Sequence, residues 1–357
     1  MQPLSGGMEI IVKIAEKYAD YIFEETKKIL EIDSPSGYTK NVAEYVIKEY
    51  EKLGYKAEMT VKGGVLVDLG GEDSDNAVMV DTHIDTLGGM VAEIKSNGNL
   101  RIVPIGGLNA NNTEAENVRV ITRSGKIYTG VFQLENASVH VNKEYSEKKR
   151  AFDCMEVLID EVTTGADDTR ALGIDVGDIV CFEPRTVITQ SGYIKSRFLD
   201  DKLSVGILLG FAKLLKDKKL TPKRKLYQHI TVYEEVGHGA AATVPEGVKE
   251  IISVDMGCVG AGLQCKETQV SICAKDSAGP YNYDVVTALV NTAKDNGIDY
   301  AVDIYPFYGS ELDVPLKSGH DVRHGLIGAG VYASHGYERS HKDGAFATLK
   351  LLAAYLV

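Results

Sequence analysis

The hydrophobic pattern at the start of the chain predicts two helices followed by strands. Apolar residues recur every three or four positions from Met8 to Ile32, as in a helix with one buried face. The segment Asp33-Ser34-Pro35-Ser36-Gly37 ends this pattern, and a second apolar stripe continues to Leu53. Three short apolar runs then predict strands at residues 57–61, 65–69 and 77–81.

The middle of the chain follows a different pattern. From about Leu87 to Ile194, short apolar or alternating runs are separated by glycine and polar residues, with little sign of helix. Examples are the runs Met90–Ile94, Leu100–Pro104 and Val118–Ile121. Many short strands separated by turns are typical of a β-barrel.

Helices and strands alternate again after about Lys195. We expect a helix from Leu203 to Leu215, strands ending at Tyr233 and Asp255, a helix from Tyr283 to Asn296, a strand from Tyr300 to Ile304 and a helix containing Ala345 to Tyr355. This alternation predicts an α/β fold. Residues 1–87 and 195–357 would form one α/β domain, and residues 88–194 would be an inserted β-barrel domain.

The strongest indication of chemistry is the acidic pair Glu234-Glu235, which ends an apolar run and is soon followed by Gly237. Acidic pairs are common on solvated surfaces, so this pair alone does not identify a site. Successive side chains of a strand point to opposite faces. A pair at the end of a strand can therefore direct one carboxylate to a metal ion and the other to a water molecule.

Three further segments place polar groups at the ends of apolar runs. They are Ala77–Asp85, which ends in His83-Ile84-Asp85, the pair Asp200-Asp201 before an apolar run, and the strand-like Ile251–Asp255. In open α/β sheets, ligands bind at the carboxyl ends of the strands. We therefore expect these segments to meet at one site.

The residue types in these segments suit two Zn²⁺-like ions, which take nitrogen and oxygen ligands and share one carboxylate. Four ligands are predicted to be His83, Asp200, Glu235 and Asp255. A fifth is expected in the segment 333–341, which contains both His335 and His341.

Two other residues have predicted roles beside these ligands. Asp85 lies two residues beyond His83 and is suited to accept the second imidazole proton, which would fix the tautomer of the ring. Glu234 is left without a metal and is predicted to be the general base.

These segments, in this order, resemble the M42 family of dimetal aminopeptidases, from Pro35-Ser36-Gly37-Tyr38 to the last helix. The resemblance implies an α/β/α metallopeptidase domain of the zinc-exopeptidase type with an inserted β-barrel. It implies that Asp200 bridges two ions, that His83 and Asp255 complete one site, and that Glu235 and a C-terminal histidine complete the other. In the related M20 hydrolases the extra domain comes later in the chain.

The chain departs from the family pattern at the last ligand. Where relatives carry a His-Ser-Pro-like segment, this chain has Ser334-His335-Gly336 and, further on, His341. We favour His335, because a ligand directly after a strand is better fixed. The loop Pro306–Asp313 resembles the substrate loop of the family only loosely, so the pocket for the N-terminal residue is left undefined. The remaining histidines are predicted to be structural, exposed or substrate-facing: His140, His229, His238, His320 and His324.

Composition narrows the possible partners. The formal net charge is −12, and no block of lysine and arginine is dense enough to predict a nucleic-acid surface. The five cysteines form no Cys-x-x-Cys pair, which suits a reducing compartment. No apolar run approaches the ~20 residues that span a bilayer, and no signal peptide is evident. We expect a soluble, cytoplasmic protein.

The predicted function is removal of the N-terminal residue from short peptides, with two divalent ions, Zn²⁺ or Co²⁺, and an ion-shared water activated by Glu234. The resemblance also implies a closed homo-oligomer, expected to be a dodecamer with contacts made by the inserted barrel. Two alternatives are an endoglucanase-like hydrolase, because some relatives carry that label, and a non-catalytic assembly protein stabilised by metal.

Overall fold

The computed structural model describes residues 16–357. The first part of the helix expected from Met8 to Ile32 lies outside the described residues. The helices are α2 (Lys17–Leu30), α3 (Lys40–Lys52), α4 (Ala166–Ala171), α5 (Leu199–Lys218), α6 (Tyr283–Asp295), α7 (Asp313–Lys317) and α8 (Lys342–Leu356).

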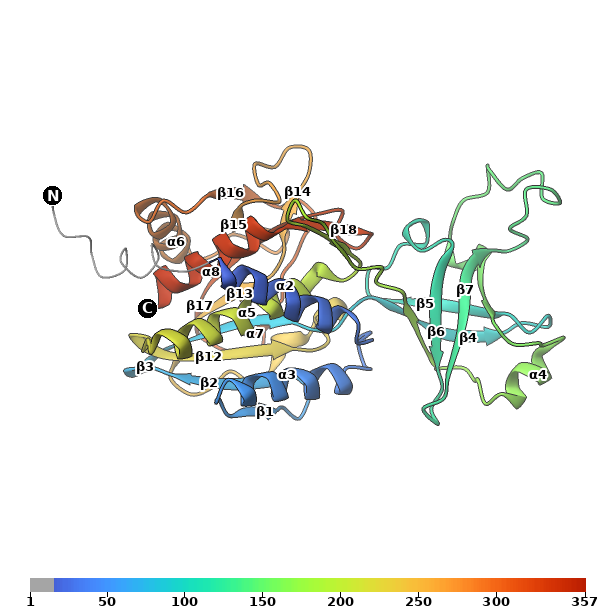
Figure 1. The fold of residues 1–357 in the computed structure, drawn as a ribbon, viewed down its shortest axis with the longest axis horizontal. Coiled ribbons are helices and arrows are strands. Elements are labelled where there is room, and N and C mark those ends of the chain that lie inside the picture. The colour runs from blue at the N-terminus through green and yellow to red at the C-terminus, as the bar shows by residue number, and fades with distance from the viewer. Residues whose placement is uncertain (1–15) are drawn as a thin grey trace.

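Two groups of strands make up the β structure (Figure 1). One group forms a 12-stranded sheet: β1 (Ala57–Met59), β2 (Val65–Gly70), β3 (Asp73–His83), β10 (Val187–Ile188), β11 (Tyr193–Ser196), β12 (Arg224–Thr231), β13 (Val248–Val254), β14 (Gly257–Val259), β15 (Val270–Lys275), β16 (Tyr300–Ile304), β17 (Arg323–Tyr332) and β18 (Glu338–His341). The other forms a closed barrel: β4 (Gly88–Ile94), β5 (Leu100–Ile105), β6 (Glu116–Ile121), β7 (Ile127–Leu134), β8 (Met155–Ile159) and β9 (Ile179–Phe182).

The centre of the large sheet is parallel. Its strands follow the order β12-β3-β13-β17, and each neighbouring pair in this group runs in the same direction. Thr231 of β12 pairs in register with His83 of β3, so these two strands end side by side. All four strands therefore end at one edge of the sheet, where side chains from distant parts of the sequence can meet.

The main helices pack against the sheet and against one another. Helix α5 contacts β3 and β17, α8 contacts β17 and β15, and α2 packs on both helices. Helix α5 is buried along most of its length, and α2 approaches it closely at Gly206 and Gly210. A Cβ atom at these glycines would lie 2.2 Å from Thr26 Oγ1 and 2.6 Å from Ile22 Cγ1, so larger residues would push the helices apart.

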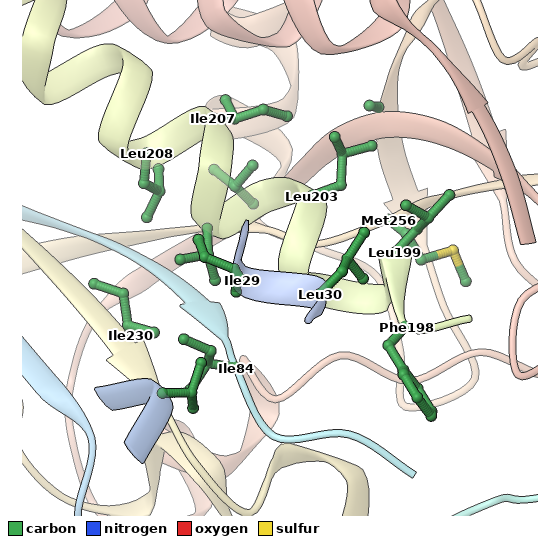
Figure 2. Close-up of a cluster of buried hydrophobic side chains, with 14 of the residues drawn as sticks. Ile29, Leu30, Ile84, Phe198, Leu199, Leu203, Ile207, Leu208, Ile230 and Met256 are labelled. Atoms are coloured by element: carbon green, nitrogen blue, oxygen red, sulfur yellow. The ribbon is translucent and has the colours of Figure 1, made fainter. Parts of the chain in front are cut away.

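A hydrophobic cluster lies directly beneath the edge where the parallel strands end (Figure 2). It contains Ile84, which follows His83, Leu199, which precedes Asp200, and Met256, which follows Asp255. Burying a side chain of this size contributes ~1.5–3 kcal/mol. His83, Asp200 and Asp255 are therefore each held by an apolar neighbour in sequence that is fixed in the core.

The barrel projects from one end of the α/β body, opposite the C-terminus (Figure 1). Its strands close in the order β4-β5-β8-β7-β6-β9. Phe132 and Phe182 pack edge to face in its interior, with ring centroids 5.6 Å apart. These strands lie within the interval 88–194, and the last strands of that interval, β10 and β11, join the large sheet through β18.

The predicted fold class is confirmed, an α/β unit with an inserted β-barrel. The strand expected from Tyr300 to Ile304 is found at those bounds. The strand expected to reach Tyr233 ends at Thr231, and Glu234–Val236 form a short 3₁₀ turn, η3. The acidic pair therefore leaves the sheet through a turn, because Tyr233 takes a left-handed backbone conformation with φ of 71°. Among residues 16–357, no helix combines the length and hydropathy that crossing a bilayer requires.

His229 on β12 gives a testable consequence of burial. Its side chain is almost fully buried, its Nδ1 has no hydrogen-bond partner within residues 16–357, and burial lowers its pKa to about 4. As pH falls below about 6.5, His229 binds a proton in the unfolded chain but stays neutral in the folded chain. The folded state therefore loses stability between pH ~6.5 and ~4. At pH ~4 this loss should approach ~3 kcal/mol.

We predict that His229→Gln makes the free energy of unfolding less dependent on pH in this range. Urea denaturation of parent and variant at pH values across the window would measure it. His140→Gln, at an exposed histidine, is the matched control and should keep the pH dependence of the parent. An unchanged pH dependence in His229→Gln would contradict this account.

Candidate metal centre

The predicted site residues come together at the carboxyl edge of the parallel strands. His83 is the last residue of β3, and Asp255 directly follows β13. Glu234 and Glu235 lie in η3 just beyond β12, and His335 lies in the loop that follows β17. The fifth segment, at Asp200, is the start of α5. This convergence follows from the parallel direction of the strands.

Two groups of potential ligands share one carboxylate. His83, Asp200 and Asp255 form one group, and Asp200, Glu235 and His335 form the other; within each group the ligand atoms lie within 4.8 Å of one another. Asp200 Oδ1 is 3.1 Å from His83 Nε2, whereas Asp200 Oδ2 is 3.5 Å from His335 Nε2. The two oxygens of Asp200 therefore face different histidines.

Glu234 belongs to neither group. Its Oε2 lies 3.8 Å from His83 Nε2, and its side chain lines the cavity over the site. The carboxylate is thus next to the predicted ligands but is not part of either cluster. This is the position that a proton acceptor beside a metal centre needs.

Asp85 has a different set of contacts from the one expected. The Nδ1 atom of His83 lies 3.0 Å from the main-chain oxygen of Asp85 and 3.6 Å from its carboxylate, so the shorter contact is to the backbone. The carboxylate accepts hydrogen bonds from the main-chain N–H groups of Glu234, at 3.1 Å, and Glu235, at 3.3 Å. It also accepts one from the hydroxyl of Ser36. Asp85 thus holds the imidazole with its backbone and the acidic turn with its side chain.

Glu338 on β18 performs a similar task on the other side and was not foreseen. Its carboxylate accepts the main-chain N–H of Asp200 at 3.0 Å and that of His335 at 3.0 Å. One buried side chain therefore fixes the backbone of two predicted ligands. The only signal in the sequence was an acidic residue three positions beyond His335, which is too common a pattern to identify such a role.

Four non-glycine residues around the centre have a left-handed backbone. They are Phe198, Tyr233, Ala333 and His335, with φ between 60° and 71°. Such conformations cost free energy for residues with a Cβ atom, and they persist where the surrounding structure enforces them. Phe198 and Tyr233 each come just before an acidic pair, so these turns direct the carboxylates into the site.

A loop of the barrel side also reaches the centre. Gly106 and Gly107 follow β5, and a Cβ atom on Gly107 would lie 2.6 Å from His335 Nδ1. A Cβ atom on Gly106 would lie 3.3 Å from the Cβ of Glu235. Only residues without side chains fit here, so the barrel loop packs against the predicted second group of ligands.

The electrostatics of the centre favour a cation. Burial raises the pKa of Glu234 and of Glu235 well above the usual range, and burial raises the pKa of Asp255 to about 6. Burial also acts to raise the pKa of Asp200, but the hydrogen bond and charge of His83 outweigh it, and the pKa is lowered.

No lysine or arginine within residues 16–357 forms an ion pair with Asp200, Glu234, Glu235 or Asp255. Burying carboxylates without compensation is costly, and a divalent ion is the compensation that suits this geometry. The donors are imidazole nitrogens and carboxylate oxygens, which is the set that Zn²⁺ and similar ions use. The residues present therefore fit a metal centre.

The centre opens on a cavity of about 770 Å³. Its lining includes the loop from Pro306 to Glu311, together with Ser277 and Ala278. This loop is anchored by Ser310 and Tyr281, whose hydroxyl groups are 2.7 Å apart. The loop whose role was undefined in the sequence therefore forms the wall of the cavity.

The other histidines lie outside the two groups. His341 caps α8, where its Nδ1 accepts the N–H of Asp343, and its Nε2 lies 2.8 Å from the main-chain oxygen of Ser191. His238 is exposed and stacks on Tyr233 at 5.0 Å. His140, His229, His320 and His324 are also absent from both groups.

Comparison with known proteins gives consistent results. The sequence profile described as M42 glutamyl aminopeptidase matches residues 63–351. The Bacillus subtilis (strain 168) protein YhfE, which carries a provisional aminopeptidase name, is 42% identical over 93% of this chain and 96% of its own. An aminopeptidase from the archaeon Desulfurococcus kamchatkensis has a similar structure, with a TM-score of 0.85, 22% identity and 95% of each chain covered. The TET1 peptidase of Pyrococcus horikoshii, described as assembling into a tetrahedron or a large octahedral shell, gives a TM-score of 0.82 at 22% identity, covering 93% of this chain and 98% of that one.

The geometry predicts how metal content responds to substitution. We predict that Asp200→Ala weakens metal binding at both groups, because Asp200 belongs to both, whereas His335→Ala weakens it only at the second. His341→Ala is the control and should keep both. Metal analysis after dialysis would measure the number of ions per chain. One ion bound with normal affinity in Asp200→Ala would exclude the shared role.

Proposed function

The chain belongs to the M42 glutamyl aminopeptidase family, and we propose that it is a dinuclear metallo-aminopeptidase that removes the N-terminal residue of short peptides. The observation that carries this proposal is the pair of ligand groups sharing Asp200, with Glu234 beside them and outside both. The members of the two groups other than His83, together with Glu234, line the same cavity. A substrate that enters this cavity would therefore meet both ions and the base.

In this proposal, His83 and Asp255 would hold one ion, Glu235 and His335 would hold the other, and Asp200, which belongs to both groups, would be shared by the two. When bound, the ions would lower the pKa of water and polarise the scissile carbonyl. Zn²⁺ and Co²⁺ suit the mixed nitrogen and oxygen donors best.

The residues of the chain do the rest of the chemistry. Glu234 accepts a proton from the attacking water and delivers it to the nitrogen of the leaving peptide. Asp85 keeps Glu234 and Glu235 in position through their main-chain N–H groups. Its backbone oxygen orients the ring of His83 by accepting the proton on Nδ1.

We also propose that two parts of the chain have different roles. Residues 1–87 and 195–357 would form the catalytic domain, and residues 88–194 would form an oligomerisation domain. Support comes from the shape of the molecule, because the barrel projects away from the α/β body and leaves its outer surface free for contacts (Figure 1). A structurally similar protein, PhTET1-12s, is described as a dodecamer, and this motivates a closed dodecamer here as well.

The alternatives are less well supported. A glycosidase uses two carboxylates that flank a glycosidic bond and needs no pair of metal ligand groups. A non-catalytic assembly protein has no physical need for Glu234, whose buried carboxylate costs free energy. Both alternatives leave the position of Glu234 unexplained.

The first test combines substrate choice with the proposed base. The parent protein, supplied with Zn²⁺ or Co²⁺, should hydrolyse aminoacyl substrates with a free N-terminus and leave N-acetylated ones intact. Glu234→Gln should keep its fold and metal content but lose ~10²- to 10⁴-fold in kcat, because the amide cannot accept a proton. Equal rates for parent and variant would refute the base, and cleavage of blocked substrates would refute the exopeptidase.

The second test concerns the assembly. Light scattering of the purified protein should give the mass of a closed oligomer, and removal of the outer barrel contacts by substitution should give smaller species. Val139 and Val141, exposed in the loop between β7 and β8, are candidates for replacement by aspartate. A strict monomer with full activity at all concentrations would rule out the cage as a functional requirement.

A further inference from the structure

Tyr308 lines the catalytic cavity and carries a buried hydroxyl group that makes no hydrogen bond of ordinary geometry. Its side chain lines the cavity together with Asp200, Glu234 and Asp255. The phenolic oxygen is buried and, within residues 16–357, makes no hydrogen bond of ordinary length and angle. A buried polar group without a partner costs free energy, and such groups call for an explanation.

Both the backbone and the ring of Tyr308 are held in place by neighbouring residues. Its main-chain oxygen accepts hydrogen bonds from the N–H of Ser277, at 2.9 Å, and from the hydroxyl of Ser277, at 2.7 Å. Its ring packs edge to face on Tyr305, with centroids 5.1 Å apart. The hydroxyl of Tyr305 is itself paired with Ser271. The phenol of Tyr308 is therefore a fixed group, and a preorganised donor is the kind that stabilises a transition state.

A second feature singles out Tyr308 among the tyrosines near the cavity. The hydroxyl groups of Tyr281 and Tyr305 are both satisfied, by Asp276 and Ser310 and by Ser271 respectively. Of these three hydroxyl groups, only that of Tyr308 makes no hydrogen bond of ordinary geometry, and its one weaker hydrogen-bonding contact is with Asp255. A tyrosine keeps its phenolic proton at neutral pH, so the group can donate but cannot compete with Glu234 as a base.

We propose that the Tyr308 hydroxyl donates a hydrogen bond to the oxygen of the scissile carbonyl as negative charge develops on it. This role rests on the proposed peptidase function and adds a protein donor to the carbonyl polarisation assigned to the ions. The phenol keeps its proton throughout. The C–N bond breaks as the carbonyl re-forms, and the proton taken by Glu234 from water goes to the leaving nitrogen.

A simpler role has to be separated from this one. Burial raises the pKa of the Tyr308 phenol well above its usual range, and the charge of Asp255 and a weak hydrogen bond to that carboxylate act in the same direction. The tyrosine could therefore act only on Asp255 and so on the first ligand group. That role would change metal affinity, whereas a donor to the reacting oxygen would change kcat and the binding of tetrahedral analogues.

The test is Tyr308→Phe in the metal-loaded full-length protein. We expect kcat to fall roughly 10- to 100-fold, somewhat less than for a sole oxyanion donor because the ions share the charge. KM for an aminoacyl substrate and the number of bound ions should stay close to those of the parent. A phosphinic dipeptide analogue, which mimics the tetrahedral state, should bind more weakly by about the factor lost in kcat/KM, and the free amino acid product should bind as before.

Tyr50→Phe is the matched control, because Tyr50 on α3 is a buried tyrosine whose hydroxyl bonds to Gln228 away from the site. It should lose stability without losing kcat. If the parent is active and Tyr308→Phe is equally active, the donor role is refuted while the proposed peptidase function stands. Loss of an ion with kcat unchanged at saturating metal would assign Tyr308 to Asp255 and refute it as well. A parent without peptidase activity would defeat the proposed function and this role together.

Discussion

The hydrogen bonds of Asp85 are the interactions on which the geometry of the centre depends. Its carboxylate holds the main-chain N–H groups of Glu234 and Glu235, while its own carbonyl contacts the ring of His83. A single side chain thus sets the distance between the end of β3 and the turn after β12. Asp85 is fully buried, so these bonds are not weakened by competing water. Glu338 does the same for Asp200 and His335, and together the two acids position most of the cluster through the backbone.

Much of this arrangement could be predicted from the sequence, and for one physical reason. Buried parallel strands appear as short apolar runs, and such runs stop where the chain leaves the sheet. The residues at those stops, His83 and Asp255 among them, are therefore marked by the pattern itself. The barrel was visible for a similar reason, because its interval consists of short alternating runs, whereas the α/β part also contains long stretches of helical period. The ends of the strands were predicted less exactly. The strand before Glu234 was expected to reach Tyr233, but β12 ends at Thr231, because Tyr233 has a left-handed backbone that a hydrophobic pattern does not reveal.

The supporting residues could not be predicted because their roles arise only from tertiary contacts. Glu338 is one acid among many until the chain places it under two backbone N–H groups. Tyr308 became informative because its buried hydroxyl makes no hydrogen bond of ordinary geometry, which is a property of the packed structure and not of any motif. The contact of His83 with the backbone oxygen of Asp85, in place of its carboxylate, likewise depends on how the chain turns after β3.

The glycines after β5 have an implication for how such a protein can evolve. Gly106 and Gly107 touch Glu235 and His335, so the barrel and the centre share a boundary with no spare volume. A sequence change that tilted the barrel to suit a new neighbour would displace His335 as well. Coupling of this kind acts in both directions. A ligand that displaces His335 therefore also changes the free energy of the orientation that the barrel takes relative to the α/β body. The contact at Gly106 and Gly107 is therefore one place on the boundary between barrel and α/β body where a change in assembly and a change in the chemistry of the centre must occur together.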